Sequence, residues 1–325
     1  MTRVGLDVSP LLQTRAGTAR YVSGLQRYVE GIDYVPFSFG SRSRPGAAFR
    51  DAFWYPALLA RQADAAGVDV LHCPTFRGPA RSRVPLVVTV HDLAVLRHPE
   101  TFNRWTRTYS RVAVSRVARA AERVIAVSEF TRDEAVELLG VERERVRVVP
   151  NGIEEVFTPE GEAAEGEYVL AVGTLEPRKN LERLAEATRR LVVELRVVGA
   201  RGWGSVALPD HVRALGFLPD AELARLYRGA SCVAYPSLYE GFGIPILEAM
   251  ACGTPVVTSR GGATEETAGG AAVLVDPLDV ASIAAGIEEA RSRREELRPL
   301  GLARAERFHW AESARATADV YREAA

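Results

Sequence analysis

Short Val-rich runs alternate with helix-length amphipathic segments along this chain, and this alternation constrains its fold more than any other feature. Val-rich runs with helices between them are typical of parallel sheets buried on both faces. About six such runs lie in each half, so we predict an α/β protein with two Rossmann-like, doubly wound domains. The predicted strands are Val4–Val8, Val35–Phe39, Val68–His72, Leu86–Val90, Val124–Val127, Val146–Val149, Tyr168–Val172, Leu195–Val198, Ala214–Phe217, Cys232–Ala234, Val256–Thr258 and Ala272–Val275.

The chain length and one solvated stretch set the expected domain boundaries. A chain of 325 residues suits two domains. The stretch TPEGEAAEGE combines Pro, Gly and acidic residues with almost no large apolar side chain, which is typical of a linker. We therefore expect an N-terminal domain at 1–158, a C-terminal domain at 159–308 and a final segment at 309–325. Predicted helices include Thr18–Gly31, Arg104–Ala121, Glu129–Gly140 and Val280–Arg293.

The charge and cysteine content exclude several classes of protein. The 41 basic and 42 acidic residues give a net charge of −1, so no global field favours nucleic acid. The three cysteines lack metal-ligand spacing and are too few for a disulfide framework, which indicates reduced thiols in the cytoplasm. The chain starts directly in a predicted strand, so we expect no signal peptide. No apolar stretch reaches about 18 residues, so we expect no membrane-spanning helix.

The segment YPSLYEGFGIPILEAMACGTPVVTS, residues 235–259, carries the richest pattern. A predicted strand ends in a loop with Gly241 and Gly243, and a helix is predicted to start near Pro245, because Pro suits the first helical position. Amides at a helix start suit a phosphate. Glu240 precedes this helix, and Glu248 is expected in its first turn, where carboxylates can accept hydrogen bonds from sugar hydroxyls. A plain glycine turn with two surface glutamates is equally compatible with these residues alone.

Two further clusters follow predicted strands, whose carboxyl ends are the ligand-binding edge of an open parallel sheet. VGTLEPRKN, residues 172–180, places Arg178 and Lys179 near a helix start, where they can clamp a diphosphate. Two solvated cations at a helix end are the alternative. VVTVHDL, residues 87–93, places His91 and Asp92 after a strand; a structural His and a helix-capping Asp are the ordinary roles there.

The chain resembles retaining glycosyltransferase family 4, whose members have the GT-B fold. The resemblance rests on two glutamates separated by seven residues in a Pro-Ser and Glu-Gly-Phe-Gly setting, here Pro236, Ser237, Glu240, Gly241, Phe242, Gly243 and Glu248. It implies two domains facing across a cleft. It also implies that Glu248 binds the donor ribose, that Glu240 contacts the donor sugar, and that the amides around Gly241–Gly243 hold sugar or phosphate.

The resemblance covers nearly the whole chain and assigns further roles. It implies that Arg178 and Lys179 bind the donor diphosphate and that His91 lies beside the donor sugar. The family often has two glycines where this chain has Ala16–Gly17, and often Gly at the position of Asn180. The last helix, beginning near Trp310, resembles the one that crosses back to the first domain. The implied donor-binding residues are Gly17, Gly173, Arg178, Lys179, Phe217, Leu218, Glu240, Gly241, Phe242, Gly243, Ile244 and Glu248, and the implied catalytic residues are His91, Glu240, Arg178 and Lys179.

The implied reaction transfers a hexose from a nucleotide-diphosphate sugar, without a metal or other cofactor, to a glycan, lipid-linked or small-molecule acceptor. The similarity to bacterial mannosyltransferase-like members favours mannose. A phosphorylase or sugar-nucleotide epimerase of the same fold, and a non-catalytic nucleotide-sugar-binding protein, are the alternatives. A dinucleotide-dependent dehydrogenase is excluded because no predicted strand is followed by the glycine fingerprint.

Arginines recur in the predicted helix near residues 104–121 and just beyond it. A solvated face is the ordinary interpretation. A patch for anionic lipid or a polyprenyl-diphosphate acceptor, with peripheral contact at the inner face of the membrane, is the sharper hypothesis. The arginines concerned are Arg104, Arg107, Arg111, Arg116, Arg119 and Arg123.

Overall fold

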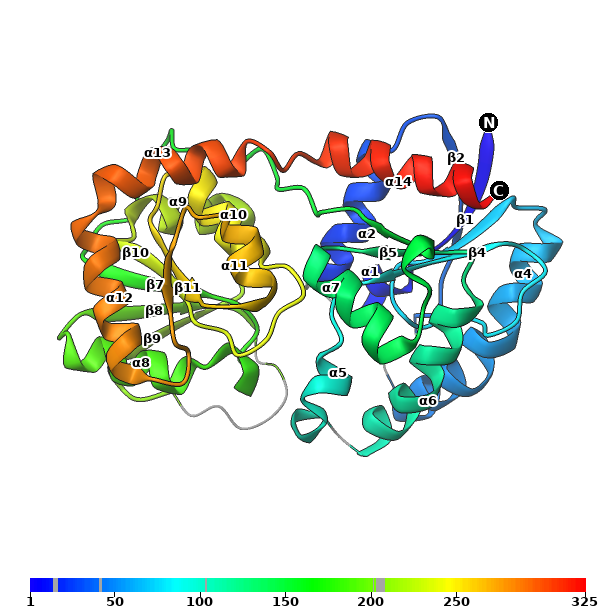
Figure 1. Ribbon diagram of the computed structural model, residues 1–325, viewed down its shortest axis with the longest axis horizontal. Helices are drawn as coiled ribbons and strands as arrows, with labels where there is room; N and C mark the ends of the chain where they lie inside the picture. Colours follow the sequence, from blue (N-terminus) through cyan, green and yellow to red (C-terminus); the bar gives the residue numbers. More distant parts are fainter. Residues whose placement is uncertain (14–16, 41–42, 103, 201, 203–207) are drawn as a thin grey trace. The chain divides into compact units, whose positions relative to one another are not determined.

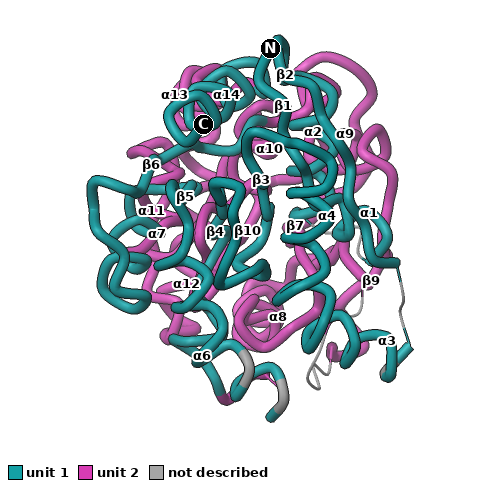
Figure 2. Tube along the Cα trace, turned by 90° about the vertical axis from the view of Figure 1, so that its right-hand side faces the viewer, with its two compact units in different colours: residues 1–99, 103–152, 310–325 teal, residues 100–102, 153–309 magenta. Residues whose placement is uncertain are grey.

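The computed structural model describes the chain from Met1 to Ala325 apart from residues 14–16, 41–42, 103, 201 and 203–207. It divides into two compact units, drawn teal and magenta in Figure 2. The first unit comprises Met1–Pro99, Asn103–Gly152 and Trp310–Ala325, and the second comprises Glu100–Phe102 and Ile153–His309.

A six-stranded parallel sheet, in the order β2-β1-β3-β4-β5-β6, forms the centre of the first unit. Its strands are β1 (Thr2–Asp7), β2 (Ile32–Phe37), β3 (Val70–Cys73), β4 (Leu86–Val90), β5 (Arg123–Ala126) and β6 (Val146–Val148). The helices of this unit are α1 (Ser9–Gln13), α2 (Gly17–Tyr28), α3 (Arg44–Phe49), α4 (Leu59–Ala65), α5 (Ala94–Arg97), α6 (Arg104–Ala120), α7 (Glu129–Glu134) and α14 (Trp310–Ala324).

The second unit repeats this architecture with a six-stranded parallel sheet in the order β12-β11-β10-β7-β8-β9. Its strands are β7 (Tyr168–Val172), β8 (Glu194–Val198), β9 (Val212–Gly216), β10 (Cys232–Tyr235), β11 (Val256–Ser259) and β12 (Val273–Val275). Its α-helices are α8 (Leu181–Arg190), α9 (Asp220–Gly229), α10 (Ile244–Ala251), α11 (Gly262–Ala268), α12 (Val280–Ser292) and α13 (Arg294–Ala305) (Figure 1).

All twelve predicted strands are confirmed, with ends that move by a few residues, and so is the prediction of two doubly wound sheets. The reason is visible in β4, whose five residues are all buried. Val88 and Val90 pack into one apolar cluster, whereas Val87 packs into another that includes Tyr321 of α14. A strand that is covered by helices on both faces favours apolar residues at nearly every position, which produces the Val-rich runs; the buried Thr89 of β4 is hydrogen-bonded to His72.

The change from one unit to the other lies earlier than the expected boundary at 158–159. The amide of Ile153 donates to the carbonyl of Phe308, and Ile153 forms a β-bridge with His309. These main-chain contacts attach residues 153–158 to the second unit before the acidic stretch begins. Near the C-terminus, the chain returns to the first unit at Trp310, one residue after the expected start of the final segment.

Some predicted helices differ in detail from the structure. The one expected to end at Gly31 ends at Tyr28, and the one expected over Glu129–Gly140 is α-helical to Glu134 and π-helical over Ala135–Leu139. A further π-helical segment, η1 (Arg50–Leu58), connects α3 to α4 and was not predicted. In the described part of the chain, no helix is both long and apolar enough to cross a bilayer.

Candidate active site

Two neighbouring strands of the second unit bring its motifs together. β7 pairs with β10 in parallel, so the segments that follow them emerge at the same edge of the sheet. After β7 come Gly173 and a 3-10 turn, η5 (Pro177–Lys179), which leads into α8. After β10 come residues 236–243, and α10 then begins with Pro245 in its first turn, as predicted. Gly243, just before α10, has a φ of 111°, a conformation that favours glycine.

Glu240 is the centre of a buried ion-pair cluster at this edge. Its Oε2 accepts from Nη1 of Arg178 at 2.7 Å, and its Oε1 accepts from Nζ of Lys179 at 2.5 Å. The Tyr235 hydroxyl donates to the same Oε1 at 2.9 Å and accepts from Lys179 at 2.6 Å. The Glu240, Arg178 and Lys179 side chains are only 8%, 14% and 10% exposed. The two predicted clamp cations are therefore not solvated side chains.

The pKa values of this cluster show how strongly its charges are coupled. Burial alone would raise the pKa of Glu240, but Arg178 and Lys179 outweigh it and lower the pKa to about 2. Burial also lowers the pKa of Lys179, and the Glu240 carboxylate offsets part of that effect. Glu240 is thus a carboxylate at any physiological pH, and two fixed cations contact it.

Sequence reasoning missed two members of this cluster. Glu176 is 1% exposed in its side chain, and its Oε1 lies 2.5 Å from Nε of Arg178. Tyr235 is buried, and the ammonium of Lys179 lies 4.8 Å from the centre of its ring. Both residues stand inside segments that the sequence singled out, but nothing in their spacing shows that a carboxylate after β7 would hold a neighbouring arginine.

Asn180 explains why a glycine is common at this position in the family. Its φ is 58°, in the left-handed region that glycine adopts without strain. Its amide group donates to the carbonyls of Pro236 and Pro277, at 3.0 and 2.6 Å, and so connects the loop after β7 to the loops after β10 and β12. Asn tolerates this conformation better than most residues, and here it also bonds the two loops together.

Glu248 lies one turn later in the helix than predicted. Because α10 begins at Ile244, Glu248 is its fifth residue, and the first turn carries no acidic residue. The side chain is buried, with 2% of the residue exposed, and Oε2 accepts from the hydroxyl of Tyr227 in α9 at 2.8 Å. Glu240 and Glu248 therefore belong to separate hydrogen-bonding clusters, on the loop and on the body of the helix.

The other predicted donor-binding residues of the second unit fall into two groups. Gly173, Gly241, Gly243 and Ile244 lie in the loops or at the start of α10, at the carboxyl edge of the sheet. A Cβ at Gly173 would lie 3.1 Å from Cε of Lys179. The ring of Phe242, in contrast, is buried and packs edge-on against Phe308 at 5.8 Å, so its side chain is structural.

Phe217 and Leu218 follow β9, the strand at the edge of the sheet. Phe217 is 49% exposed, and Leu218 is partly exposed in the short loop before α9. An exposed aromatic ring after a strand suits stacking on a base. Glu265 and Glu266 of α11 are partly exposed, and the carboxylate of Glu265 accepts from the amide of Gly261, the residue before this helix.

In the first unit, His91 follows β4 as predicted and contacts two other elements. Its Nε2 donates to the carbonyl of Pro74 at 3.0 Å, and the ring of Tyr21 packs edge-on against it at 4.8 Å between centroids. Burial lowers the pKa of His91, so the ring is neutral. Because a carbonyl can only accept, Nε2 carries the proton and Nδ1 keeps its lone pair. Asp92 accepts from the amide of Ala94 at 3.0 Å, which supports its predicted capping role at α5.

His91 and Asp92 line a pocket of about 580 Å³ in the first unit. Gly17, the first residue of α2, precedes Thr18 in the wall of this pocket, and a Cβ at Gly17 would meet no atom within 4 Å. Its neighbour Ala16 lies outside the described residues. No described residue therefore packs so closely against Gly17 that a side chain would be excluded there.

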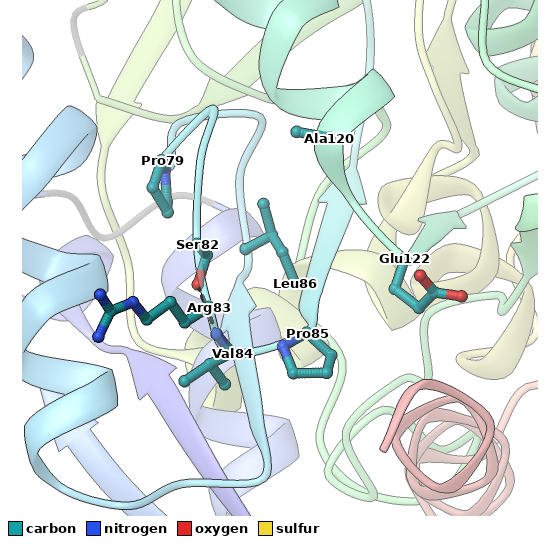
Figure 3. Close-up of a pocket in the computed structure, with 8 residues that line it drawn as sticks. All are labelled: Pro79, Ser82, Arg83, Val84, Pro85, Leu86, Ala120 and Glu122. Carbon is teal, nitrogen blue, oxygen red and sulfur yellow. Dashed lines mark hydrogen bonds between the residues drawn. The ribbon is translucent and has the colours of Figure 1, made fainter.

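A second cavity of about 190 Å³ lies at the opposite ends of the strands (Figure 3). Leu86 begins β4 and Glu122 directly precedes β5, so this cavity is at the amino-terminal edge of the sheet, away from the ligand-binding edge. The side chains of Arg83 and Glu122 point away from each other in this view. No set of groups converges here that would bind a ligand.

The arginine stripe is only partly on one helix. Arg104, Arg111, Arg116 and Arg119 are exposed on α6, whereas Arg123 belongs to β5 and its Nε lies 3.2 Å from Glu323 of α14. The helix ends at Ala120 because the chain must turn into the sheet. Peripheral membrane contact through the remaining arginines stays a prediction.

The arrangement in the second unit can stabilise negative charge. Two cations, main-chain amides and the start of α10 lie at one sheet edge, which is where a leaving diphosphate would be held. Among the residues that the structure describes, no group of three or more His, Cys, Asp or Glu side chains lies close enough to hold a metal ion.

Comparisons with known proteins agree with this arrangement. Residues 5–157 match the family described as Glycosyltransferase Family 4, and residues 152–303 match Glycosyl transferases group 1. The chain is 33% identical to O-antigen chain mannosyltransferase B of Escherichia coli over 282 residues, which is 78% of this chain and 74% of that protein.

Two solved structures share the fold. Sucrose-phosphate synthase from Thermosynechococcus elongatus superposes with a TM-score of 0.81 at 21% identity, covering 99% of both chains. Anabaena HepE in complex with UDP superposes with a TM-score of 0.74 at 22% identity, covering 98% of this chain and 99% of that one. The chain therefore belongs to glycosyltransferase family 4 and is a hexosyltransferase of the GT-B fold.

Proposed function

We propose that this protein transfers a hexose from a nucleotide-diphosphate sugar to an acceptor, with retention of the anomeric configuration and without a metal. The observation that carries the proposal is the contact of Arg178 and Lys179 with Glu240 at the ligand-binding edge of the second sheet. A leaving diphosphate needs fixed positive charge, and a hexose needs a carboxylate for its hydroxyls. These three side chains would provide both.

Each predicted residue has a role in this proposal. Arg178, Lys179 and the amides at the start of α10 hold the diphosphate. Glu240 accepts from hydroxyls of the sugar, and Glu248 accepts from those of the ribose. His91 is proposed to support, through its ring and backbone carbonyl, the positive charge that develops at the anomeric carbon.

Mannose is the favoured sugar, because the Escherichia coli relative is a mannosyltransferase. The solved HepE complex contains UDP, so uridine nucleotides are among the donors to be tested. The acceptor is a glycan, a lipid-linked molecule or a small molecule.

The donor can be identified by thermal unfolding with GDP, UDP, ADP and their hexose derivatives, because a ligand that binds only the folded state raises the melting temperature. One nucleotide series should stand out. Transfer with that donor should then proceed in EDTA, and the one-bond carbon–proton coupling constant at the product's anomeric centre should indicate the same anomeric configuration as in the donor. Inversion or loss of activity in EDTA would contradict the proposal, and turnover with free phosphate as acceptor would indicate a phosphorylase.

A further inference from the structure

The pocket that includes His91 lies where three strands of the first sheet end. Pro10 lies beyond the end of β1, Thr75 and Arg77 follow β3, and His91 follows β4. The π-helical segment η1 closes the pocket with Arg50 and Tyr55. Its volume of about 580 Å³ falls in the range of small-molecule sites. π-Helical turns are rare and frequently occur at functional sites.

The polar groups of this pocket are mostly hydrogen-bond donors. Thr75 accepts from the amide of Arg77 through Oγ1, so its hydroxyl proton remains to donate. Burial raises the pKa of Tyr55, so its phenol keeps its proton, but that proton is already directed to Asp7 and does not count as a donor for a ligand. Two guanidinium groups add charged donors, and Asp92 is the only carboxylate among the described residues that line the pocket. A lining of this kind suits a ligand that is rich in acceptor oxygens.

Arg50 is held rigidly in the wall. Only 9% of the residue is exposed; Nε donates to Asp51 at 2.9 Å and Nη1 donates to Gln13 at 3.1 Å. Gln13 is fixed in turn, because its amide donates to the carbonyl of Phe39 at 3.1 Å. The remaining Nη2 of Arg50 has no partner among the described residues. A guanidinium that is ordered in advance loses little entropy when it binds an anion.

Arg77 supplies charge that no side chain balances. Its guanidinium makes no hydrogen bond or ion pair with any described residue, although the residue is only partly exposed. Arg50, in contrast, has Asp51 as its counter-ion, and Asp7 lies close enough for the charge of Arg50 to lower the pKa that burial raises. The positive charge available to a ligand therefore comes from Arg77, and Arg50 adds oriented donors.

We infer that this pocket binds an acidic group of the acceptor, a phosphate or a carboxylate, between the guanidinium groups of Arg77 and Arg50. Arg forks match the geometry of both anions. The inference rests on the proposed function, because the bound molecule is identified as the acceptor only by the presence of His91, the residue proposed to act on the donor sugar, in the same pocket. It narrows the acceptor to a molecule that carries an acidic group.

Isothermal titration of the full chain tests this inference. The probes are inorganic phosphate, glucose 6-phosphate, glucuronate and geranyl diphosphate, with uncharged glucose as the matched probe. Each titration is run alone and with saturating nucleoside diphosphate, which blocks the clamp of the second unit. At least one acidic probe should bind, and Arg77→Gln should weaken it about tenfold or more, because a charge-assisted hydrogen bond is lost. Arg61→Gln, which removes an exposed arginine on α4 that has no proposed role in binding, should change nothing.

The probe that binds identifies the source of the anion: a sugar phosphate, a sugar acid or a lipid-linked diphosphate. Arg77→Gln is the decisive variant because the Arg77 side chain makes no hydrogen bond or ion pair with a described residue, whereas Arg50→Gln would remove the counter-ion of the buried Asp51. The inference is overturned if no acidic probe binds in either condition, if glucose binds as well as glucose 6-phosphate, or if Arg77→Gln and Arg61→Gln behave alike.

A Lys179→Ala variant separates this inference from the proposed function. It should abolish binding of nucleoside diphosphate and leave binding of the acidic probe intact, the reverse of Arg77→Gln. If Lys179→Ala leaves nucleotide binding unchanged while Arg77→Gln still removes the probe, the donor clamp is wrong and the anion pocket stands. If Lys179→Ala abolishes nucleotide binding but Arg77→Gln leaves binding of the acidic probe unchanged, the donor clamp is supported and the anion pocket is wrong.

Discussion

Lys179 and Glu240 form a buried ion pair, with 2.5 Å between Nζ and Oε1. Arg178 holds the other oxygen of the same carboxylate at 2.7 Å. In the ligand-free chain, the cations that are proposed to bind the donor diphosphate are thus neutralised by the carboxylate that is proposed to bind its sugar. Diphosphate must compete with Glu240 for these donors, and its arrival frees the carboxylate to accept from sugar hydroxyls.

Removing the charge of Glu240 should therefore separate binding from turnover. In Glu240→Gln, Lys179 loses its carboxylate partner and Arg178 keeps only Glu176, so we expect nucleoside diphosphate without sugar to bind about tenfold more tightly, which is about 1.4 kcal/mol. Turnover with the complete donor should fall. Calorimetric titration and initial rates measure the two effects, with Glu182→Gln on the exposed side of α8 as the control. Weaker binding of the bare nucleotide would show that no such competition exists.

Glu248 should act on nucleotide affinity through a direct contact. Glu248→Ala removes an acceptor for ribose hydroxyls, so nucleotide-sugar binding should weaken about tenfold. Tyr227→Phe is the matched variant, because it removes the same internal hydrogen bond and keeps the carboxylate. Titration of both variants distinguishes a ligand contact from a structural role. Equal losses in the two would mean that Glu248 only supports the helix.

Substitutions of Asn180 should show how much its left-handed backbone conformation lowers the free energy of unfolding. Asn180→Gly and Asn180→Ala both lose the bonds to Pro236 and Pro277, but only Ala must adopt a φ of 58° with a side chain. We expect the Ala variant to have a free energy of unfolding about 1 kcal/mol below that of the Gly variant. Urea-induced unfolding measures the difference. An Ala variant as stable as the Gly variant would mean that the loop relaxes.

His72 should make the first unit sensitive to acid. It is fully buried between Thr89 and Tyr321, at 2.8 and 2.7 Å, and burial lowers its pKa from 6.5 to about 3. Below pH 6.5 the imidazole of His72 binds a proton in the unfolded chain but not in the folded chain. The free energy of unfolding therefore has its full value above that pH and decreases as the pH falls toward 3. The loss should reach about 2 kcal/mol at pH 5.

His72→Gln should remove this part of the pH dependence, whatever it does to stability at pH 7.5. Urea-induced unfolding at pH 7.5 and pH 5 measures the slope. His309→Gln, at an exposed position, should keep the slope of the parent chain. A slope that survives in His72→Gln would assign the acid sensitivity to another group.

Local pattern was sufficient to predict the sheets, because a strand such as β4 is covered on both faces and cannot include a polar residue without a partner. It was also sufficient for the start of α10, where Gly243 and Pro245 have strong backbone preferences. It was not sufficient for η1, since Arg50, Asp51 and an internal Pro56 do not resemble a buried helix. Those charges are tolerated only because they pair with each other.

In the candidate site, too, local features were predictable from the sequence and contacts between distant segments were not. Glu240, Arg178 and Lys179 were identified by a family pattern, but their mutual contact follows from the pairing of β7 with β10, which no local spacing reveals. Glu176 and Tyr235 were missed for this reason. Glu248 was placed too early because one turn of α10 separates the helix start from the glutamate.

A crystal structure of the full chain with bound nucleoside diphosphate tests the central claim most directly. The account predicts the phosphates within hydrogen-bonding distance of Lys179 and the amides of residues 241–244, with the ribose hydroxyls at Glu248 and the Lys179–Glu240 contact broken. Phosphates bound anywhere else, or an ion pair that persists unchanged beside them, would contradict it.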